Sequence, residues 1–206
     1  MKVSFLTILL VLFGMYANAQ NATLSPYSYY GIGQLVSTRT AENNTIGGVT
    51  TYADSTQFSL DNPATIGKLR YAQYRVGANY KSSIQETSQA NAAVSTAALN
   101  YLSLTVPTKH VAFSFGLKPK SALGYRVNTT TENNDLEYRN LLSGTGGVNS
   151  TFLSLAFNPY KGLSLGASVA YNFGYNEKTY TQTSSVIQNS TQIFTYAELS
   201  GIQYTL

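Results

Sequence analysis

The segment LSLGASVAYNFGY, residues 163–175, alternates between two kinds of side chain. Its odd positions, from Leu163 to Tyr175, are large or apolar, whereas its even positions are Ser, Gly, Ala and Asn. Successive side chains of a β-strand point to opposite faces of the sheet. A period of two therefore predicts a strand with one apolar face and one small, polar face.

The same alternation recurs along the chain and predicts six strands in all. Two of the segments are irregular, because Asn100 and Glu198 each fall on an otherwise apolar row, which allows a bulge or a register change there. Two further alternating runs meet at Pro119, and we interpret them as one long strand bent at that residue. The predicted strands are residues 72–80, 98–106, 110–130, 151–158, 163–175 and 193–206.

The connections between these strands alternate in length. Short turns are predicted at 107–109 and 158–162, whereas 82–97, 129–150 and 178–192 are long and rich in Ser, Thr, Asn, Gln and Gly, which is typical of loops. Short turns at one end and long loops at the other are typical of an outer-membrane β-barrel, with the short turns on the periplasmic side.

The length of the 163–175 strand fits a membrane. At a rise of about 3.3 Å per residue it spans about 43 Å, and a tilt of about 45° reduces this to the roughly 30 Å of a bilayer's hydrocarbon core. The apolar row would then face lipid and the small row would face a lumen. A soluble β-sandwich is the alternative, but its solvent face normally carries Lys, Glu and Thr, and its strands run about 5 to 6 residues.

Composition and the N-terminus support export. Only 11% of the 206 residues are charged and the net charge is +4, which excludes an ordinary soluble surface and leaves no basic footprint for nucleic acid. Lys2, an apolar run from Val3 to Met15 and Ala17-Asn18-Ala19 predict a signal peptide at 1–19. With Gln20 first in the mature chain and no cysteine, a lipoprotein anchor is excluded. The predicted location is the bacterial outer membrane.

Residues 20–69 do not have the pattern of strands. The stretch from 45 to 69 mixes turn residues with short apolar pieces. Within it Asn62 can cap a short helix and Pro63 can occupy its first position, because the missing N–H of proline costs nothing there. The helix would continue from Ala64 to about Leu69, although Gly67 disfavours it.

Two motifs in this segment resemble Bacteroidetes members of the FadL-like family of outer-membrane transporters for hydrophobic compounds. The matching residues are SPYSYYGIG at 25–33 and Asn62-Pro63-Ala64, which precede the first predicted barrel strand. The resemblance implies that residues 20–69 form a hatch that plugs the lumen, with Asn62, Pro63 and Ala64 as the hatch motif, and that 70–206 form barrel strands. It also implies about 14 strands in a chain roughly twice as long, whereas bacterial barrels begin at about eight. We therefore expect the six strands to be the first part of a longer barrel; a small eight-stranded barrel, with two further strands within 25–60, is the alternative.

The sequence contains no pattern that indicates an enzyme, a cofactor site or a metal site. His110 is the only histidine and follows a predicted short turn without companion ligands. The carboxylates Glu132, Asp135 and Glu137 lack the ligand spacing of a calcium loop. Gly31-Ile32-Gly33 has no preceding strand, which makes a nucleotide-binding loop a weak interpretation.

Arg75 and Arg126 are the charged residues that we expect to face the lumen, because both lie on small, polar rows. On the lipid side a charge would cost about 2–4 kcal/mol at the membrane midplane. Inside, each arginine would either pair with a carboxylate of the hatch, such as Asp54 or Asp61, or be solvated in a wet lumen.

Three functions are compatible with this sequence. The first is hatch-gated, passive uptake of hydrophobic small molecules, with selection by pocket shape and desolvation. The second is a barrel scaffold without solute transport, whose segments 129–150 or 178–192 bind a secreted or surface protein. The third is a small structural barrel. All three imply outer-membrane lipid as the surroundings and the barrel-assembly machinery as a partner during insertion.

Overall fold

The computed structural model describes residues 23–37, 39–86, 91–133, 136–160, 162–184 and 190–206. The predicted signal peptide at 1–19 lies outside these residues. None of the helices in the described part is long and apolar enough to cross a membrane.

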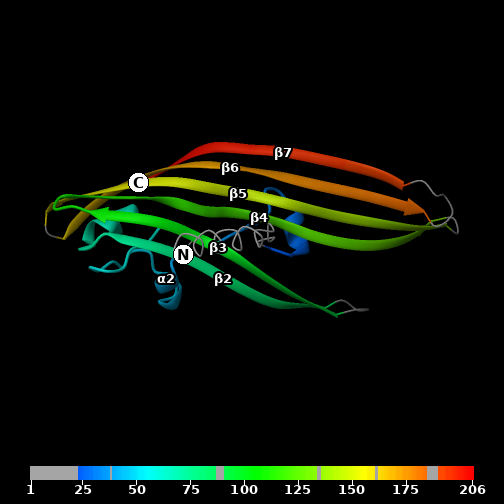
Figure 1. Ribbon diagram of the computed structural model, residues 1–206, viewed down its shortest axis with the longest axis horizontal. Coiled ribbons are helices and arrows are strands. Elements are labelled where there is room, and N and C mark those ends of the chain that lie inside the picture. The colour runs from blue at the N-terminus through cyan, green and yellow to red at the C-terminus, as the bar shows by residue number, and fades with distance from the viewer. Residues whose placement is uncertain (1–22, 38, 87–90, 134–135, 161, 185–189) are drawn as a thin grey trace, which may run out of the picture.

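The protein is an all-β structure built on one antiparallel sheet (Figure 1). Six long strands follow one another along the chain and pair in the same order, so that each strand is hydrogen-bonded to its neighbour in sequence. The prediction of six strands and of a barrel-like antiparallel fold is therefore confirmed. The strands are β2 (Gln73–Glu86), β3 (Asn91–Pro107), β4 (Val111–Asn133), β5 (Leu136–Tyr160), β6 (Leu163–Ser184) and β7 (Ser190–Thr205).

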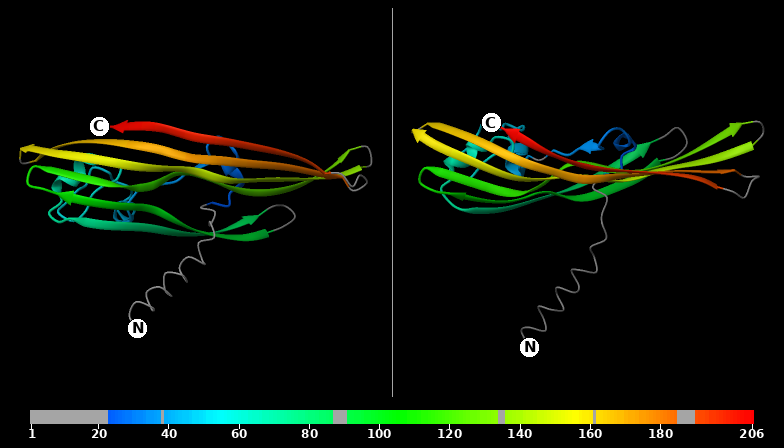
Figure 2. Two further views of the ribbon diagram at one scale, coloured as in Figure 1. Left: turned by 45° about the horizontal axis from the view of Figure 1, so that its top comes forward. Right: turned by 90° about the horizontal axis from the view of Figure 1, so that it is seen from above.

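The sheet curves strongly, and residues 23–69, which we name the N-terminal segment, lie against its concave face (Figure 2). We call the concave face inner and the convex face outer. The segment contains four short elements: η1 (Pro26–Tyr29), β1 (Gln34–Leu35), α2 (Ala41–Thr45) and η2 (Pro63–Lys68). β1 is a strand that the sequence did not predict, and it pairs with β4 at Ser121 and Ala122.

The prediction of long loops is wrong, because most residues of these segments belong to strands. The segments are 82–97, 129–150 and 178–192. Thr129 pairs with Asn140 and Thr131 with Tyr138, in a ladder that continues to Asn133. Polar composition suggested loops here, but Thr favours strands and a hairpin can extend as long as its backbone groups pair. The short turns at 107–109 and 158–162 are confirmed in place, since β4 begins at Val111 and β6 at Leu163.

Three irregularities in pairing shape the sheet, and one of them lies between Phe157 and Tyr160 of β5, next to the turn into β6. The register also shifts between Gly77 and Ala78 of β2 opposite Asn100, where the sequence allowed a bulge. The third shift lies between Pro119 and Ser121 of β4. By contrast, β7 pairs with β6 without a shift, so Glu198 sits in a regular ladder opposite Tyr175.

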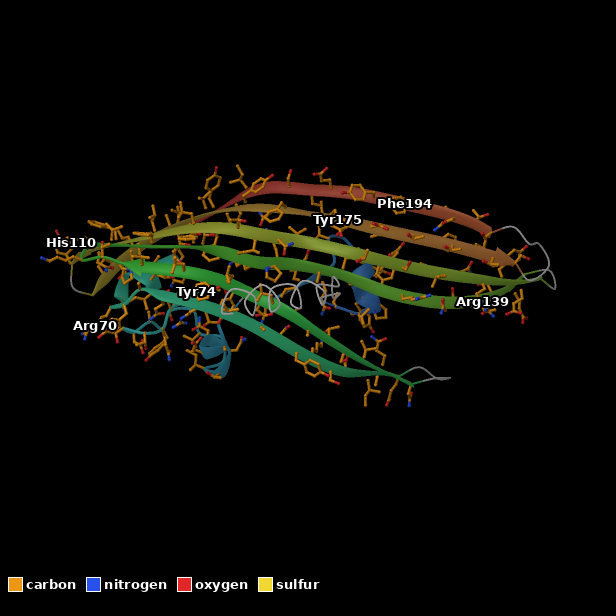
Figure 3. All side chains as sticks on the ribbon, viewed as in Figure 1. Arg70, Tyr74, His110, Arg139, Tyr175 and Phe194 are labelled. Atoms are coloured by element: carbon orange, nitrogen blue, oxygen red, sulfur yellow. The ribbon has the colours of Figure 1, made fainter. Side chains whose placement is uncertain are left out.

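The outer face carries the apolar row predicted from β6. Every odd residue from Leu163 to Tyr175 is exposed, and every even one is partly covered on the inner face. Tyr171 stacks on Phe173 with ring centroids 6.1 Å apart, and Tyr175 stacks on Tyr196 of β7 at 6.0 Å (Figure 3). Beyond Tyr175 the same row continues as Glu177 and Thr179, so the aromatic side chains mark one border of the apolar band. This arrangement is expected of a lipid-facing surface.

The sheet divides between β3 and β4. β3 pairs with β4 only where Leu102–Pro107 meet Ala112–Leu117. From there the β2–β3 hairpin diverges from the remaining strands (Figure 1), and β1 pairs with β4 next to the point of division.

A charge placed on the outer row should distinguish a lipid-facing band from a solvated surface. We expect Val169→Arg to lower the free energy of unfolding in lipid vesicles by about 2–4 kcal/mol, because Val169 lies on the outer row of β6. Ala170→Arg, which places the same charge on the inner row one residue later, is the matched control and should cost much less. Urea titration of both variants measures the difference, and equal losses would contradict the assignment of the two faces.

Candidate functional site

The main structural feature that the fold assembles is the contact between the N-terminal segment and the inner face of the sheet. At the end with the short turns, η2 begins as the sequence predicts: Asn62 is the N-cap, its side chain accepts a hydrogen bond from the N–H of Ala64 at 3.2 Å, and Pro63 occupies the first position. The helix is 3-10 rather than α and ends at Lys68. The cap satisfies a backbone donor that a helix start leaves unpaired.

η2 lies directly on small residues of the sheet. A side chain at Gly166 of β6 would overlap the backbone of Pro63 and Ala64, so only glycine permits this approach. Asn158 of β5 donates a hydrogen bond from its side-chain amide to the carbonyl of Gly67 and fills the space beside that glycine. Glycine at position 67, which disfavours a helix, is thus explained by the close packing of Asn158 against its backbone.

An apolar cluster joins η2 to the sheet. It consists of Phe58, Ile66 and Leu69 from the N-terminal segment with Ala112 and Ala156 from β4 and β5. Phe58 and Ile66 are each 1% exposed. Burying such side chains stabilises by about 1.5–3 kcal/mol each, and this makes the cluster the main apolar attachment of the segment.

Arg75 lies on the inner face and binds the N-terminal segment. Of the two outcomes expected for it, pairing with a carboxylate of that segment and solvation in a lumen, the structure shows the first. The Arg75 guanidinium lies 3.4 Å from Glu42, donates to Gln73 at 2.9 Å and to the carbonyl of Thr56, and sits 4.7 Å from the ring centroid of Phe58. The side chain is 15% exposed. The carboxylate that pairs with it is Glu42 of α2, not either of the two suggested from the sequence.

Those two carboxylates have other contacts. Asp61 forms an ion pair of 3.6 Å with Lys118 of β4, whose ammonium also lies 5.7 Å from the ring centroid of Phe152. Asp54 accepts the backbone N–H groups of Thr56 and Gln57, which lower the pKa of its carboxyl. Lys118 was missed from the sequence, although a lysine on the small row of β4 was the signal for it.

A second attachment lies further along β4 and uses the 25–33 motif. The Ser28 hydroxyl is 3.0 Å from the carbonyl oxygen of Gly124, and the rings of Tyr29 and Tyr125 meet edge to face at 5.5 Å. Lys178 of β6 donates to the carbonyl of Tyr29 at 2.7 Å and lies 4.8 Å from the centroid of its ring.

Gly33 completes this attachment. It has φ +96, and an added Cβ would lie 2.5 Å from the carbonyl oxygen of Ala122. Gly33 of the GIG sequence therefore permits a close approach of the two backbones.

Arg126 is a correction to the sequence prediction, because it lies on the outer row. Tyr125 is buried on the inner face, so its neighbour Arg126 points to the other face and is exposed. The register shift between Pro119 and Ser121 causes this, since one extra residue exchanges the two faces of a strand. The sequence pattern on either side of Pro119 could not reveal the exchange.

Among the described residues, no three His, Cys, Asp or Glu side chains are grouped so that they could hold a metal ion. Glu132 and Glu137 face each other across the β4–β5 hairpin, and Asp135 lies outside the described residues. His110 lies at the short-turn end (Figure 3).

Comparison with known proteins assigns the family. A family model described as BamG matches residues 1–206. The chain belongs to the BamG family. No curated protein and no solved structure matches it.

The family relates the chain to outer-membrane β-barrel assembly, and together with the sheet-rich fold it associates the chain with the outer membrane. The family match does not test the resemblance to FadL-like transporters, so that resemblance stays a prediction. Asn62, Pro63 and Ala64, the residues of the hatch motif, lie at η2 as described.

Clefts remain between the N-terminal segment and the sheet, and one of about 620 Å³ lies between the segment and strands β2 and β3. Another cleft of about 320 Å³ lies between the N-terminal segment and strands β4 to β7. Leu60, Phe152 and Ala170 line it together with Lys118 and Lys120. Lys120 crosses toward β7 and donates to the side chain of Gln203 at 2.7 Å.

The Arg75 contacts should hold the N-terminal segment against the sheet. We expect Arg75→Ala to lower the free energy of local opening by about 2 kcal/mol, because it removes charge-assisted hydrogen bonds and leaves Glu42 without its cation. Limited proteolysis of the folded protein should then cut the segment about 30-fold faster. Arg70→Ala, at an exposed position, is the control (Figure 3). Equal cleavage of both variants would contradict the role of Arg75.

Gly166 offers an independent test of the η2 contact. We expect Gly166→Ala to displace Pro63 and Ala64 and to destabilise the docked segment by about 1–3 kcal/mol, because the new methyl group meets backbone atoms. Gly201→Ala is the matched control, since an added Cβ there has nothing within 4 Å. Hydrogen exchange of residues 58–69, measured by mass spectrometry, should rise only in the Gly166 variant. Unchanged exchange would show that the contact is not needed.

Proposed function

We propose that this protein is an outer-membrane barrel scaffold that associates stably with the barrel-assembly machinery, and that it has no enzymatic activity. The family match over the whole chain carries the proposal. It favours the scaffold hypothesis over solute transport, because the family is related to barrel assembly.

The attachment of the N-terminal segment supports a static plug. The segment is bound at η2 by apolar contacts, at Arg75 and Lys118 by ion pairs, and near Tyr29 by hydrogen bonds and ring contacts. Opening a path along the inner face would break several of these together. A fixed plug suits a protein that presents surfaces to partners.

The extended hairpins supply such surfaces. On β6 the outer row turns polar after Tyr175, and the strand continues to Ser184. On β5, Asn140 accepts side-chain hydrogen bonds from Tyr180 at 2.9 Å and Gln182 at 3.1 Å, which orders the same region. An ordered, polar ladder beyond the apolar band is a rigid surface for protein binding.

The decisive measurement separates a lasting subunit from a passing client, because every outer-membrane barrel meets the assembly machinery once during insertion. Pulse-labelled, tagged full-length protein is purified in mild detergent at increasing chase times. We expect the machinery's barrel subunit to remain at a constant ratio for hours. An unrelated outer-membrane barrel with the same tag is the control and should lose the machinery within minutes. A ratio that decays like the control would overturn the proposal.

Passive uptake of hydrophobic small molecules is the second candidate, and the cleft of about 320 Å³ beside the N-terminal segment is the observation in its favour. Lys118 and Lys120 in its lining weigh against a purely apolar solute. Uptake of labelled hydrophobic compounds by cells with and without the gene tests it, and equal uptake across compound classes would remove it.

A further inference from the structure

The division of the sheet leaves one edge of β4 without a neighbouring strand. β3 pairs with β4 only as far as Leu117, whereas β4 continues to Asn133 and pairs there with β5 and, at Ser121 and Ala122, with the short β1. This edge lies inside the strand order, between two consecutive strands, and not at either end of the sheet.

The N-terminal segment occupies the first part of this edge. The N–H of Val36 donates to the carbonyl of Lys120 at 3.1 Å, β1 pairs at Ala122, and the N–H of Ser25 donates to the carbonyl of Gly124 at 2.9 Å. The occupied positions are every second residue, as expected for one side of a strand.

The same spacing places the N–H and C=O groups of residues 126, 128, 130 and 132 on that side. The pairing of β4 with β5 has no register shift between Ser121 and Asn133, so the alternation holds along this length. Among the described residues, none donates to or accepts from these groups on the β3 side. Four consecutive pairs of backbone groups are therefore available.

This free edge lies at the level where the outer row of β6 is polar, beyond Tyr175. Arg126 of β4 pairs with Ser143 of β5, and Ser143 pairs with Thr179 of β6. Thr179 lies four residues after Tyr175 on the outer row of β6 and two residues after Glu177. Arg126, Asn128 and Thr130 are exposed. Water can reach these groups, so the open edge is tolerated there, as it would not be in lipid. It is also accessible to a protein on that side.

The geometry selects an extended segment. β1 already adds to the same edge in antiparallel register, and this shows that the edge accepts a strand. Strand addition uses main-chain hydrogen bonds for affinity and side chains for specificity. Residues 126–132 would bind a segment of about seven residues, about 23 Å long.

The charge next to the edge indicates the chemistry of that segment. Arg126 is exposed, and no ion pair joins it to another described residue. Glu132, at the other end of the edge, is exposed on the same row. An acidic side chain on the added strand would meet the Arg126 guanidinium, and a basic side chain six positions away would meet Glu132.

A second copy of the chain does not fit. Two barrels in one membrane have the same orientation, so their β4 strands would run parallel and bring one Arg126 close to the other. Like charges facing each other across strands are destabilising. The occupant is therefore a different protein.

We propose that the edge of β4 from Arg126 to Glu132 binds an extended segment of a partner protein by antiparallel strand addition, with an acidic residue of the segment at Arg126 and a basic residue at Glu132. The inference rests on the proposed scaffold function and specifies where that scaffold receives a partner.

The first experiment uses the full chain in cells. A photo-crosslinking residue at Asn128 should capture a protein, and mass spectrometry should map the crosslink to a stretch of that protein with an acidic and a basic residue about six positions apart. Position Thr179, which lies at the same level but between two paired strands, is the control and should capture nothing. Crosslinks to lipid or to a second copy, or none at Asn128, would overturn the inference.

The second experiment tests the backbone directly with a synthetic peptide of the mapped stretch and the purified protein in detergent. Asn128→Pro removes a free N–H from the edge without touching the ladder to β5, and we expect the affinity for the peptide to fall about tenfold. Arg126→Glu should lower it at least as much, whereas Arg139→Glu on β5 is the charge control. Heat-dependent migration in gels verifies that each variant is folded. Unchanged affinity in both Asn128→Pro and Arg126→Glu would overturn the inference.

These outcomes are separable from those of the proposed function. If the assembly machinery stays bound in the chase experiment while Asn128 captures nothing, only the edge inference fails. If the edge binds its partner segment but the machinery dissociates like the control, the association with the machinery fails and the edge inference stands.

Discussion

The hydrogen-bonded ladder assigns every side chain of this sheet to one of two faces, and the rest of the structure depends on that assignment. Along β6 the ladder to β5 is regular from Leu165 onward, and the odd residues from Leu163 to Tyr175 face outward. Along β4 one extra residue near Pro119 reverses the assignment. Because of this reversal Leu123 and Tyr125 turn inward to meet the N-terminal segment, while Arg126 turns outward. A single insertion thus creates both an attachment site and an exposed charge.

The N-terminal segment is attached by different chemistry at its two ends. At η2 small residues allow the backbones to touch, and Phe58 and Ile66 are buried over Ala112 and Ala156. Near η1 the contacts are polar and aromatic, and they involve the backbone of β4. The segment also satisfies part of the edge that β3 leaves open. The same residues that cover the inner face therefore limit the division of the sheet.

The function follows from which surfaces remain after these contacts form. The segment lies on the inner face, with clefts of about 320 Å³ and about 620 Å³ beside it. The outer face is divided into an apolar band and a polar region of long hairpins. A protein-binding role uses the hairpins and the open edge, whereas transport would require the segment to move. The family match favours the first of these.

Local patterns in the sequence determined the strands, the short turns and the cap. Alternation over residues 163–175 defines a strand because its side-chain period is a property of the chain itself, and Asn62 caps η2 because its partner, the N–H of Ala64, is two residues away. Only the tertiary structure decided how far the hairpins extend, because polar residues in 129–150 form strand when a partner strand pairs with them. It also decided that Arg75 meets Glu42 rather than Asp54 or Asp61, and that Arg126 faces outward. Ion pairs between distant segments and the phase of a strand beyond a bulge depend on contacts that no local pattern contains.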